Sequence, residues 1–182
     1  MIRAGLSNDC PIEWEAGDMR ETGCDSVEQL SDLLDEADEA VATLANAGAF
    51  LFQLLENVNW VGFYLLKGGE LCLGPFQGKP ACTRIPAGKG VCGSAVALKR
   101  TLRVDDVHAF PGHIACDGAS RSEIVVLLRG ENGEPFGVLD IDSPLLNRFS
   151  ESDQREIERA AEIVGAKVRR RLINSDKGTI TR

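Results

Sequence analysis

Two pairs of apolar, β-branched and aromatic segments, each pair separated only by a short glycine-containing turn, constrain the fold of this chain most. They are NWVGFYLL and ELCLGPF, separated by Lys67-Gly68-Gly69, and EIVVLLR and PFGVLDID, separated by GENGE. Each segment has the length and composition of a β-strand, and strands joined by turns this short pair antiparallel. The chain is therefore expected to build an antiparallel sheet from two hairpins.

Helical segments precede and follow these strands. A capping box of Ser26 and Gln29 opens the first helix, and a second helical segment covers about residues 47–57. Ser150 and Asp153 cap the last helix in the same way. The expected buried stripes have helical spacing: Leu30, Leu33, Leu34, Ala37, Val41 and Leu44 in the first helix, and Ile157, Ala160, Ala161, Val164, Val168 and Leu172 in the last.

This order of elements predicts one α+β domain, with a central, mostly antiparallel sheet and helices packed on it in three layers. GVCGSAVALKR is expected to form a short helix and TLRV a short strand, whereas residues 74–90 and 105–120 have no regular period. The domain is assigned to residues 26–173. Residues 1–25 are expected to form an arm without regular structure, and residues 174–182 a polar tail.

Charge and composition argue against several classes of function. A net charge of −8 disfavours a nucleic-acid partner, which would require a basic face. Apolar runs such as Ile124–Leu128 are too short to cross a bilayer, and the N-terminal sequence lacks the apolar core of a signal peptide. A cytoplasmic location without a membrane partner is therefore expected. In that compartment, cysteine pairs tend to be catalytic, redox-active or metal-binding.

Two groups of strand residues carry polar or aromatic chemistry on one face. In VLDID, Asp140 and Asp142 share a face because side chains alternate along a strand. Either they accept hydrogen bonds from loop backbone or reach solvent at the strand end, or they bind a cation together with Glu123 of the neighbouring strand. Trp60 and Tyr64, four residues apart, also share a face. They belong either to the core or to the aromatic wall of a small-molecule pocket.

Three cysteines, Cys82, Cys92 and Cys116, fall in the least regular parts of the sequence. A zinc site that adds His108 and His113 is disfavoured, since no C-x₂-C pair occurs and the cysteines are ten and twenty-four residues apart. The two histidines are expected to organise the loop instead. The remaining cysteines are expected to be inert: Cys10 and Cys24 in the arm, and Cys72 in a strand.

The segment PAGKGVCG resembles a phosphate-binding loop only superficially. Thr83 occupies the position of the first glycine of that motif, and Gly90 the position of the serine or threonine that holds magnesium. The glycines are expected to let the backbone approach a small ligand. No bound cofactor and no metal are predicted.

Several motifs in order resemble the free methionine-(R)-sulfoxide reductases, which are single GAF-domain enzymes: NWVGFYLL, LGPFQGKPACTRIP, GKGVCGSAVA, DVHAFPGHIACD, SEIVVLL and GVLDIDSP. The resemblance extends from about Leu30 to Leu172 and does not include the arm. It implies thiol-dependent reduction of free L-methionine-(R)-sulfoxide to methionine, a redox-active disulfide, recycling by an external thioredoxin-type reductant, and a role in oxidative stress.

The resemblance also implies a role for each matching residue. Cys116 corresponds to the nucleophile, Cys82 to the resolving thiol and Cys92 to an auxiliary cysteine. The substrate-binding residues it implies are Trp60, Tyr64, Glu123, Asp140 and Asp142. Three nearby carboxylates would raise the pKa of the Cys116 thiol and of one carboxyl group among themselves. Glu123 is the carboxyl expected to keep its proton and act as general acid for the sulfoxide oxygen.

A non-catalytic GAF sensor, which binds a small metabolite or senses redox state through the same cysteines, is the alternative function. A sensor is normally fused to an output domain, and a chain of this length has no room for one, so the enzyme is the expected function. Its expected partners are free methionine sulfoxide and thioredoxin or a similar dithiol protein. The sequence does not decide whether the protein forms a homodimer.

Overall fold

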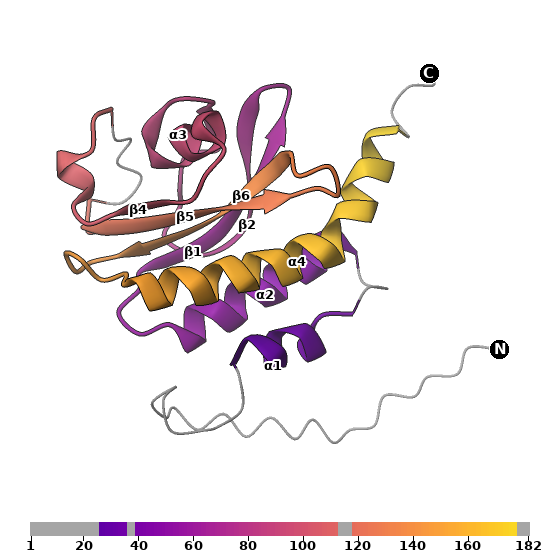
Figure 1. Cartoon of the computed structure of the whole chain (residues 1–182), viewed down its shortest axis with the longest axis horizontal. Helices are drawn as coiled ribbons and strands as arrows, with labels where there is room; N and C mark the ends of the chain where they lie inside the picture. Colours follow the sequence, from indigo (N-terminus) through magenta and orange to yellow (C-terminus); the bar gives the residue numbers. More distant parts are fainter. Residues whose placement is uncertain (1–25, 36–38, 113–117, 178–182) are drawn as a thin grey trace.

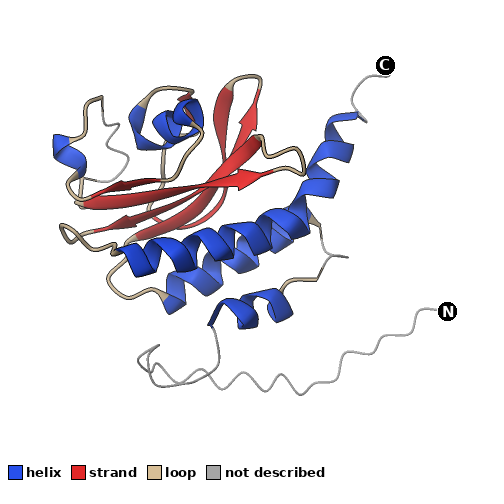
Figure 2. Cartoon of the chain, in the orientation of Figure 1, coloured by secondary structure: helices blue, strands red, loops and turns tan. Residues whose placement is uncertain are grey.

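The computed structural model describes residues 26–35, 39–112 and 118–177 of the chain. These residues form a six-stranded sheet in the order β3-β2-β1-β6-β5-β4, with helices on both faces (Figures 1 and 2). The strands are β1 (Trp60–Lys67), β2 (Glu70–Gly78), β3 (Arg84–Pro86), β4 (Leu102–Val104), β5 (Ser122–Arg129) and β6 (Pro135–Ser143). The predicted α+β class and three layers are confirmed.

Both predicted hairpins are present, and all neighbouring strands of the sheet pair antiparallel. The β1–β2 turn consists of Gly68 and Gly69, whose φ angles of 58° and 86° suit the type of turn that matches the twist of a tight hairpin. The two hairpins join where β6 pairs with β1. Residues 74–90, expected to be irregular, instead extend β2 to Gly78 and add the short edge strand β3.

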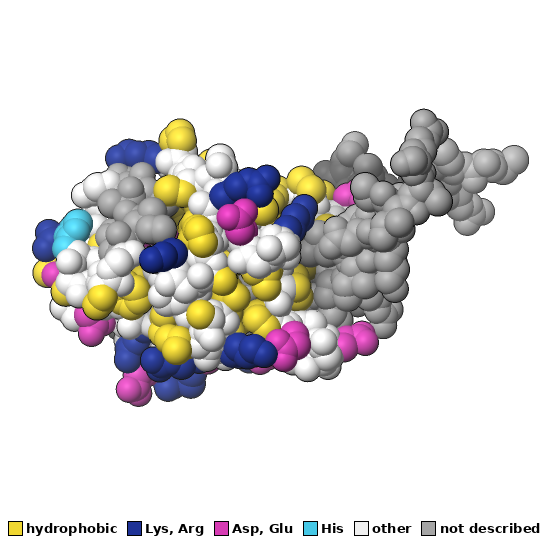
Figure 3. Space-filling model, turned by 90° about the horizontal axis from the view of Figure 1, so that it is seen from above, with side chains coloured by type: hydrophobic (Ala, Val, Ile, Leu, Met, Phe, Trp, Pro, Cys, Tyr) yellow, Lys and Arg dark blue, Asp and Glu magenta, His cyan; other side chains and the backbone are white. Residues whose placement is uncertain are grey.

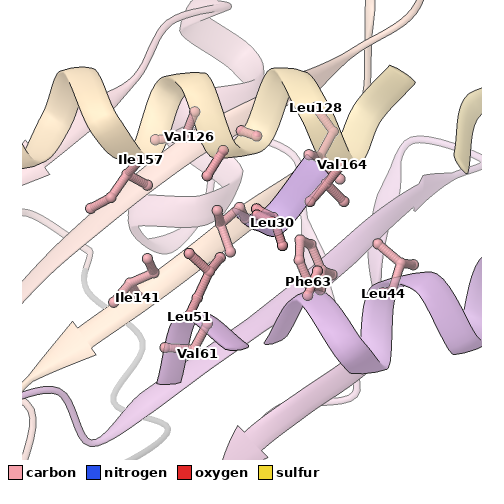
Figure 4. Packing of buried hydrophobic residues seen from close by; sticks show 14 of the residues in the cluster. Leu30, Leu44, Leu51, Val61, Phe63, Val126, Leu128, Ile141, Ile157 and Val164 are labelled. Atoms are coloured by element: carbon pink, nitrogen blue, oxygen red, sulfur yellow. The ribbon is translucent and has the colours of Figure 1, made fainter. Parts of the chain in front are cut away.

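Two helices cover one face of the sheet, α2 (Ala40–Leu54) and α4 (Glu151–Lys177), and α1 (Ser26–Leu33) packs on these two helices. Apolar side chains of these helices meet those of the strands in one continuous core (Figure 4). The strands contribute Val61 and Phe63 from β1, Val126 and Leu128 from β5, and Leu139 and Ile141 from β6. This core fixes the positions of the strands, and with them the side chains on the other face of the sheet.

The first predicted helix was wrong in its boundaries. The period of Leu30 to Leu44 suggested one continuous helix, but α1 ends at Leu33, α2 begins at Ala40, and the backbone of Glu39 is extended. A helix through this segment would bring acidic residues three and four positions apart, which is destabilising. Val41, assigned to the buried stripe, is 68% exposed as a result. Ala37 lies outside the described residues.

The cap of α4 has the predicted form. The Ser150 hydroxyl accepts a hydrogen bond from the backbone N–H of Asp153, and the Asp153 carboxylate accepts one from the N–H of Ser150. The predicted stripe is buried in the core from Ile157 to Val168. The helix continues to Lys177, into the segment expected to be a polar tail. In the described part of the chain, no helix combines the length and apolarity needed to cross a membrane.

The short helix α3 (Gly90–Leu98) lies on the other face of the sheet, above β5 and β6. Its start is fixed against β3, because the backbone N–H of Gly88 donates to the carbonyl oxygen of Gly93 and the N–H of Lys89 donates to that of Pro86. A Cβ atom on Gly93 would lie 2.4 Å from the Pro86 carbonyl oxygen. The close approach of helix and strand therefore requires glycine at position 93.

We expect Gly93→Ala to lower the free energy of unfolding by about 1–3 kcal/mol, since the added methyl group overpacks a rigid backbone contact. Gly165→Ala in α4 is the matched control, because its Cβ would have no neighbour closer than 3.8 Å. Helix propensity alone should then stabilise that variant by up to about 1 kcal/mol. Chemical denaturation of both variants measures the difference. A stabilised Gly93→Ala variant would contradict the packing assigned to α3.

Candidate active site

The register of three central strands brings the predicted aromatic and acidic residues together. On β6, Val138 packs in the apolar cluster beneath α3, whereas Leu139 and Ile141 face the helices of the opposite face. Asp140 and Asp142 therefore share the α3 side of the sheet. Asp142 is paired with Trp60 on β1 and with Glu123 on β5. The three side chains form one row across three strands.

The aromatic wall is built around Gly62. The Trp60 ring stacks on Tyr64 at 5.9 Å between centroids and on Phe76 at 5.4 Å. A Cβ atom on Gly62 would lie 2.4 Å from the Trp60 ring, so the ring covers this glycine. Gly62 is also paired with Asp140. The missing side chain thus lets the indole lie flat beside the acidic residues.

Helix α3 completes the acidic group with a thiol. The Cys92 Sγ atom lies 3.8 Å from Glu123 Oε1 in hydrogen-bonding geometry. One donor atom each from Cys92, Glu123 and Asp140 lie within 4.8 Å of one another. The exposed fractions of these residues are only 3%, 6% and 7%. We call Cys92, Glu123 and Asp140 the acid cluster.

The acid cluster and the aromatic wall border a cleft that is partly open to solvent. Figure 3 looks onto this side of the molecule, where the visible acidic side chains of the described residues lie at separate positions and not as one patch. The residues lining the cleft are Trp60, Tyr64, Lys79, Pro80, Ala81, Ile85, Gly90, Val91, Cys92, Ser120, Glu123, Asp140 and Asp142.

Burial and the repulsion between neighbouring charges raise the pKa values of the residues in the acid cluster. Desolvation, followed by the charges of Asp140 and Asp142, raises the pKa of Glu123 well above its ordinary value. Burial raises the pKa of Asp140 to about 6, partly offset by hydrogen bonding to Cys92 and Glu123. Burial and the neighbouring carboxylates raise the pKa of the Cys92 thiol well above its usual range. Cys92 is therefore a neutral thiol at neutral pH.

One polar atom of the acid cluster is unsatisfied. Within the described part of the chain, Asp140 Oδ1 is buried and has no hydrogen-bond partner. An unpaired buried carboxylate oxygen is costly, and a bound water, ion or ligand group would satisfy it. Asp140 also lines the cleft.

Two neighbouring residues at the start of β1 attach the loops that carry the predicted redox cysteines. Asn59 Nδ2 donates to Ser120 Oγ at 3.1 Å, four residues after Cys116 in the sequence. Trp60 Nε1 donates to the carbonyl oxygen of Lys79 at 3.0 Å, three residues before Cys82. Both loops are thus anchored at the same end of the same strand, beside the cleft.

The structure brings together most of the residues predicted from the sequence. Trp60, Tyr64, Cys92, Glu123, Asp140 and Asp142 all line the cleft. Cys82 is half-buried and follows Ala81 of the cleft wall. Cys116 and His113 lie outside the described residues, as do Cys10 and Cys24. His108 is exposed, and Cys72 is half-buried in β2 without a disulfide bond.

Sequence reasoning missed several residues of the cleft and its support. Ser120 and Asn59 have no pattern of their own, since their hydrogen bond joins positions far apart in the sequence. Phe76 could have been paired with β1 by counting from the Gly68-Gly69 turn, but the register shifts between Gly62 and Tyr64, so the count gives the wrong partner. A bulge of this kind is not visible in the residue types.

Comparison with known proteins agrees with this geometry. The GAF domain family model matches residues 27–168. The free methionine-R-sulfoxide reductase of Escherichia coli is 56% identical over 115 residues, which cover 63% of this chain and 69% of that protein. The structure of fRMsr of Staphylococcus aureus in its reduced form has a TM-score of 0.75 and 48% identity, covering 79% of this chain and 92% of that chain.

A third relative was solved with its substrate. Free methionine-R-sulfoxide reductase from Neisseria meningitidis, in complex with its substrate, has a TM-score of 0.74 and 44% identity, covering 82% of this chain and 89% of that chain. The chain therefore belongs to the GAF-domain family and, within it, to the free methionine-R-sulfoxide reductases.

Proposed function

We propose that this protein reduces free L-methionine-(R)-sulfoxide to methionine by thiol chemistry in the cleft between α3 and the sheet. The observation that carries the proposal is the buried acid cluster beside the Trp60 wall, both of which line one cleft. The substrate named for the relatives fits this chemistry, because it combines an ammonium group, an apolar methyl end and a polar sulfoxide.

Recognition of the free amino acid depends on charge. The carboxylates of Asp140 and Asp142 line the cleft and attract the substrate ammonium, which would satisfy the unpaired Oδ1 atom of Asp140. A charge-assisted hydrogen bond contributes about 1.5–3 kcal/mol, more than a neutral one. The indole of Trp60 provides an apolar surface for the methyl end of the substrate.

The redox steps use two thiols. The Cys116 thiolate attacks the sulfoxide sulfur, the oxygen passes to the cysteine, and methionine and a cysteine sulfenic acid result. The Cys82 thiol then condenses with the sulfenic acid, which forms a disulfide and releases water. A thioredoxin-type dithiol reopens the disulfide by thiol–disulfide exchange and is itself oxidised. The anchoring of both loops at Asn59 and Trp60 supports this pairing.

Glu123 supplies the proton that the first step requires. Sulfoxide oxygen leaves more easily when it is protonated, and a general acid works best when it stays protonated at the working pH. Burial and the nearby aspartates raise the pKa of Glu123. Cys92 takes no redox step in this scheme, since its raised pKa keeps it a thiol that hydrogen-bonds to Glu123.

The substrate range gives the first test of this function. Peptide-bound or N-acetylated methionine sulfoxide lacks the ammonium group, and its kcat/KM should fall by about tenfold or more, the value of one charge-assisted bond. NADPH consumption with thioredoxin and thioredoxin reductase measures the two substrates side by side. Equal rates on free and N-acetylated methionine sulfoxide would contradict recognition by charge.

The role of Cys82 is tested by separating the first turnover from later ones. Cys82→Ser should still form about one equivalent of methionine per protein, because the first step does not use this thiol. Thioredoxin-coupled turnover should fall steeply. Cys72→Ser is the matched control and should behave as the unmodified protein does, since Cys72 does not line the cleft. Full coupled turnover of Cys82→Ser would show that another thiol resolves the sulfenic acid.

Asp140→Asn should weaken substrate binding and stabilise the fold at the same time. KM should rise about tenfold or more. Because the folded-state pKa of Asp140 is raised to about 6, the folded protein binds this proton more tightly than the unfolded chain does. The aspartate therefore costs stability at neutral pH, and this cost disappears as the pH falls below about 4. One pKa unit corresponds to about 1.4 kcal/mol.

Thermal unfolding of Asp140→Asn and of the unmodified protein at neutral and at acidic pH checks this balance. The variant should be more stable by at least about 1 kcal/mol at neutral pH, and the gap should close in acid. A variant that is destabilised at neutral pH would show that the carboxylate is a structural cap.

Glu123→Gln should lower kcat more than it raises KM, since the amide can hydrogen-bond to the substrate but has no proton to transfer. The unmodified protein should lose activity as the pH rises through the raised pKa of Glu123, and this alkaline decline should be absent from the variant. Steady-state rates across pH measure both effects. An unchanged kcat and the same alkaline decline in Glu123→Gln would assign the general acid to another group.

A further inference from the structure

The acid cluster offers more than a site for a charged amino acid, because it combines two carboxylates with a thiol. Cys92 reaches it from the start of α3, Glu123 from β5 and Asp140 from β6. All three residues are more than nine-tenths buried. The reduction scheme uses the carboxylates for the ammonium and for proton transfer, but it assigns no chemical step to Cys92.

The distances between the three donor atoms are close to those of a metal site. Zinc bonds of about 2.3 Å to sulfur and about 2.0–2.2 Å to oxygen in a tetrahedron put neighbouring ligand atoms about 3.5 Å apart. Cys92 Sγ and Glu123 Oε1 are 3.8 Å apart, and all three donor atoms lie within 4.8 Å of one another. Side-chain shifts of about 1 Å or less close this difference.

An independent observation points to a cation at the same place. Asp140 Oδ1 is buried and, within the described part of the chain, has no hydrogen-bond partner, although Asp140 lines the cleft. An ion that enters the cleft can bind this oxygen without breaking an existing hydrogen bond of that atom. A third carboxylate, that of Asp142, lines the same cleft and adds negative charge.

We propose that the acid cluster binds one Zn²⁺ ion through the Cys92 thiolate and the carboxylates of Glu123 and Asp140, and that the bound ion excludes the substrate. Zinc displaces to solvent the protons that the Cys92 thiol and the Glu123 carboxyl group hold in the free protein. The thiolate selects zinc over magnesium and calcium, which require oxygen ligands. Three protein ligands leave the fourth position to water. The site differs from the cysteine–histidine set that the sequence disfavours, since it uses neither Cys82 nor His108.

The exclusion of substrate rests on the proposed function, because the ion takes the carboxylates that would otherwise hold the ammonium and protonate the sulfoxide. Zinc binding itself does not depend on that function. The protein would then be switched off when free zinc rises and switched on again when a chelator removes the ion.

Titration of the reduced, metal-free full-length chain with Co²⁺ tests the site directly, since cobalt reports its ligands by absorption. One equivalent should produce the sulfur-to-cobalt charge-transfer band and the strong visible bands of tetrahedral coordination, and Zn²⁺ should abolish both. Cys92→Ser should lose the charge-transfer band. Glu123→Gln and Asp140→Asn should each weaken cobalt binding by at least about tenfold. Each variant removes a direct ligand, and the loss of a group that only hydrogen-bonds to a ligand already weakens metal binding about tenfold or more.

Matched variants separate this site from other thiols. Cys72→Ser, Cys82→Ser and Cys116→Ser should keep the charge-transfer band. A band that survives in Cys92→Ser, or that is lost in Cys82→Ser or Cys116→Ser, would overturn the assignment, as would the absence of any band in the unmodified protein. Thermal unfolding checks the fold of each variant, and the two carboxylate variants test the same site if Cys92→Ser does not fold.

Exclusion of substrate is measured in Cys116→Ser, which cannot turn over. Free methionine-(R)-sulfoxide should lower the cobalt absorption, whereas glycine at the same concentration, which chelates cobalt through the same amino and carboxylate groups, should lower it much less. Equal effects of the two amino acids would contradict exclusion. A protein that binds cobalt as expected but reduces no sulfoxide would instead contradict the proposed function and leave the metal site intact.

Discussion

The pairing of β6 with β1 on one side and with β5 on the other is the constraint on which the site depends. This register puts Trp60, Asp142 and Glu123 in one row and Gly62, Asp140 and Val125 in the next. A slip by one residue would turn both aspartates into the apolar core beneath the sheet and bring Leu139 and Ile141 into the cleft. The core of α1, α2 and α4 against the opposite face prevents that slip, because it buries the alternate residues of the same strands.

The charge repulsion that destabilises this arrangement of carboxyl groups also favours the binding of a positively charged ligand. Glu123 and Asp142 lie directly opposite each other, a pairing of like charges that destabilises a sheet. Asp140 adds a third carboxyl group, and helix α3 closes over all of them with Cys92. This repulsion is reduced by protonation, which burial favours because it raises the pKa of Glu123 and of Cys92. A ligand that brings positive charge relieves it as well, so stability is given up for binding at this position.

Much of the fold and of the cleft could be predicted from the sequence, because the relevant signals are local. Turn residues and alternating strands predicted the two hairpins, and the alternation in VLDID predicted that Asp140 and Asp142 share a face. The capping residues Ser150 and Asp153 fixed the start of α4. The break between α1 and α2 could not be predicted from apolar spacing alone, since Leu30, Leu34 and Leu44 are buried in both arrangements.

The contacts that sequence analysis could not predict join distant segments. The hydrogen bond from Asn59 to Ser120 and the close packing of Gly93 against Pro86 depend on how α3 and the loops lie on the sheet. The position of Cys92 against Glu123 is of the same kind, since it requires a helix and a strand that are 31 residues apart. Local patterns thus identified which residues carry the chemistry, and tertiary packing determined which of them meet.

Thioredoxin-coupled NADPH consumption with the resolved R and S diastereomers of free methionine sulfoxide tests the proposed activity most directly. We expect sustained turnover of the R diastereomer, with one methionine formed per NADPH consumed, and little or no turnover of the S diastereomer. Absence of turnover with both, while the protein still binds a small metabolite, would contradict the enzyme and favour a sensor.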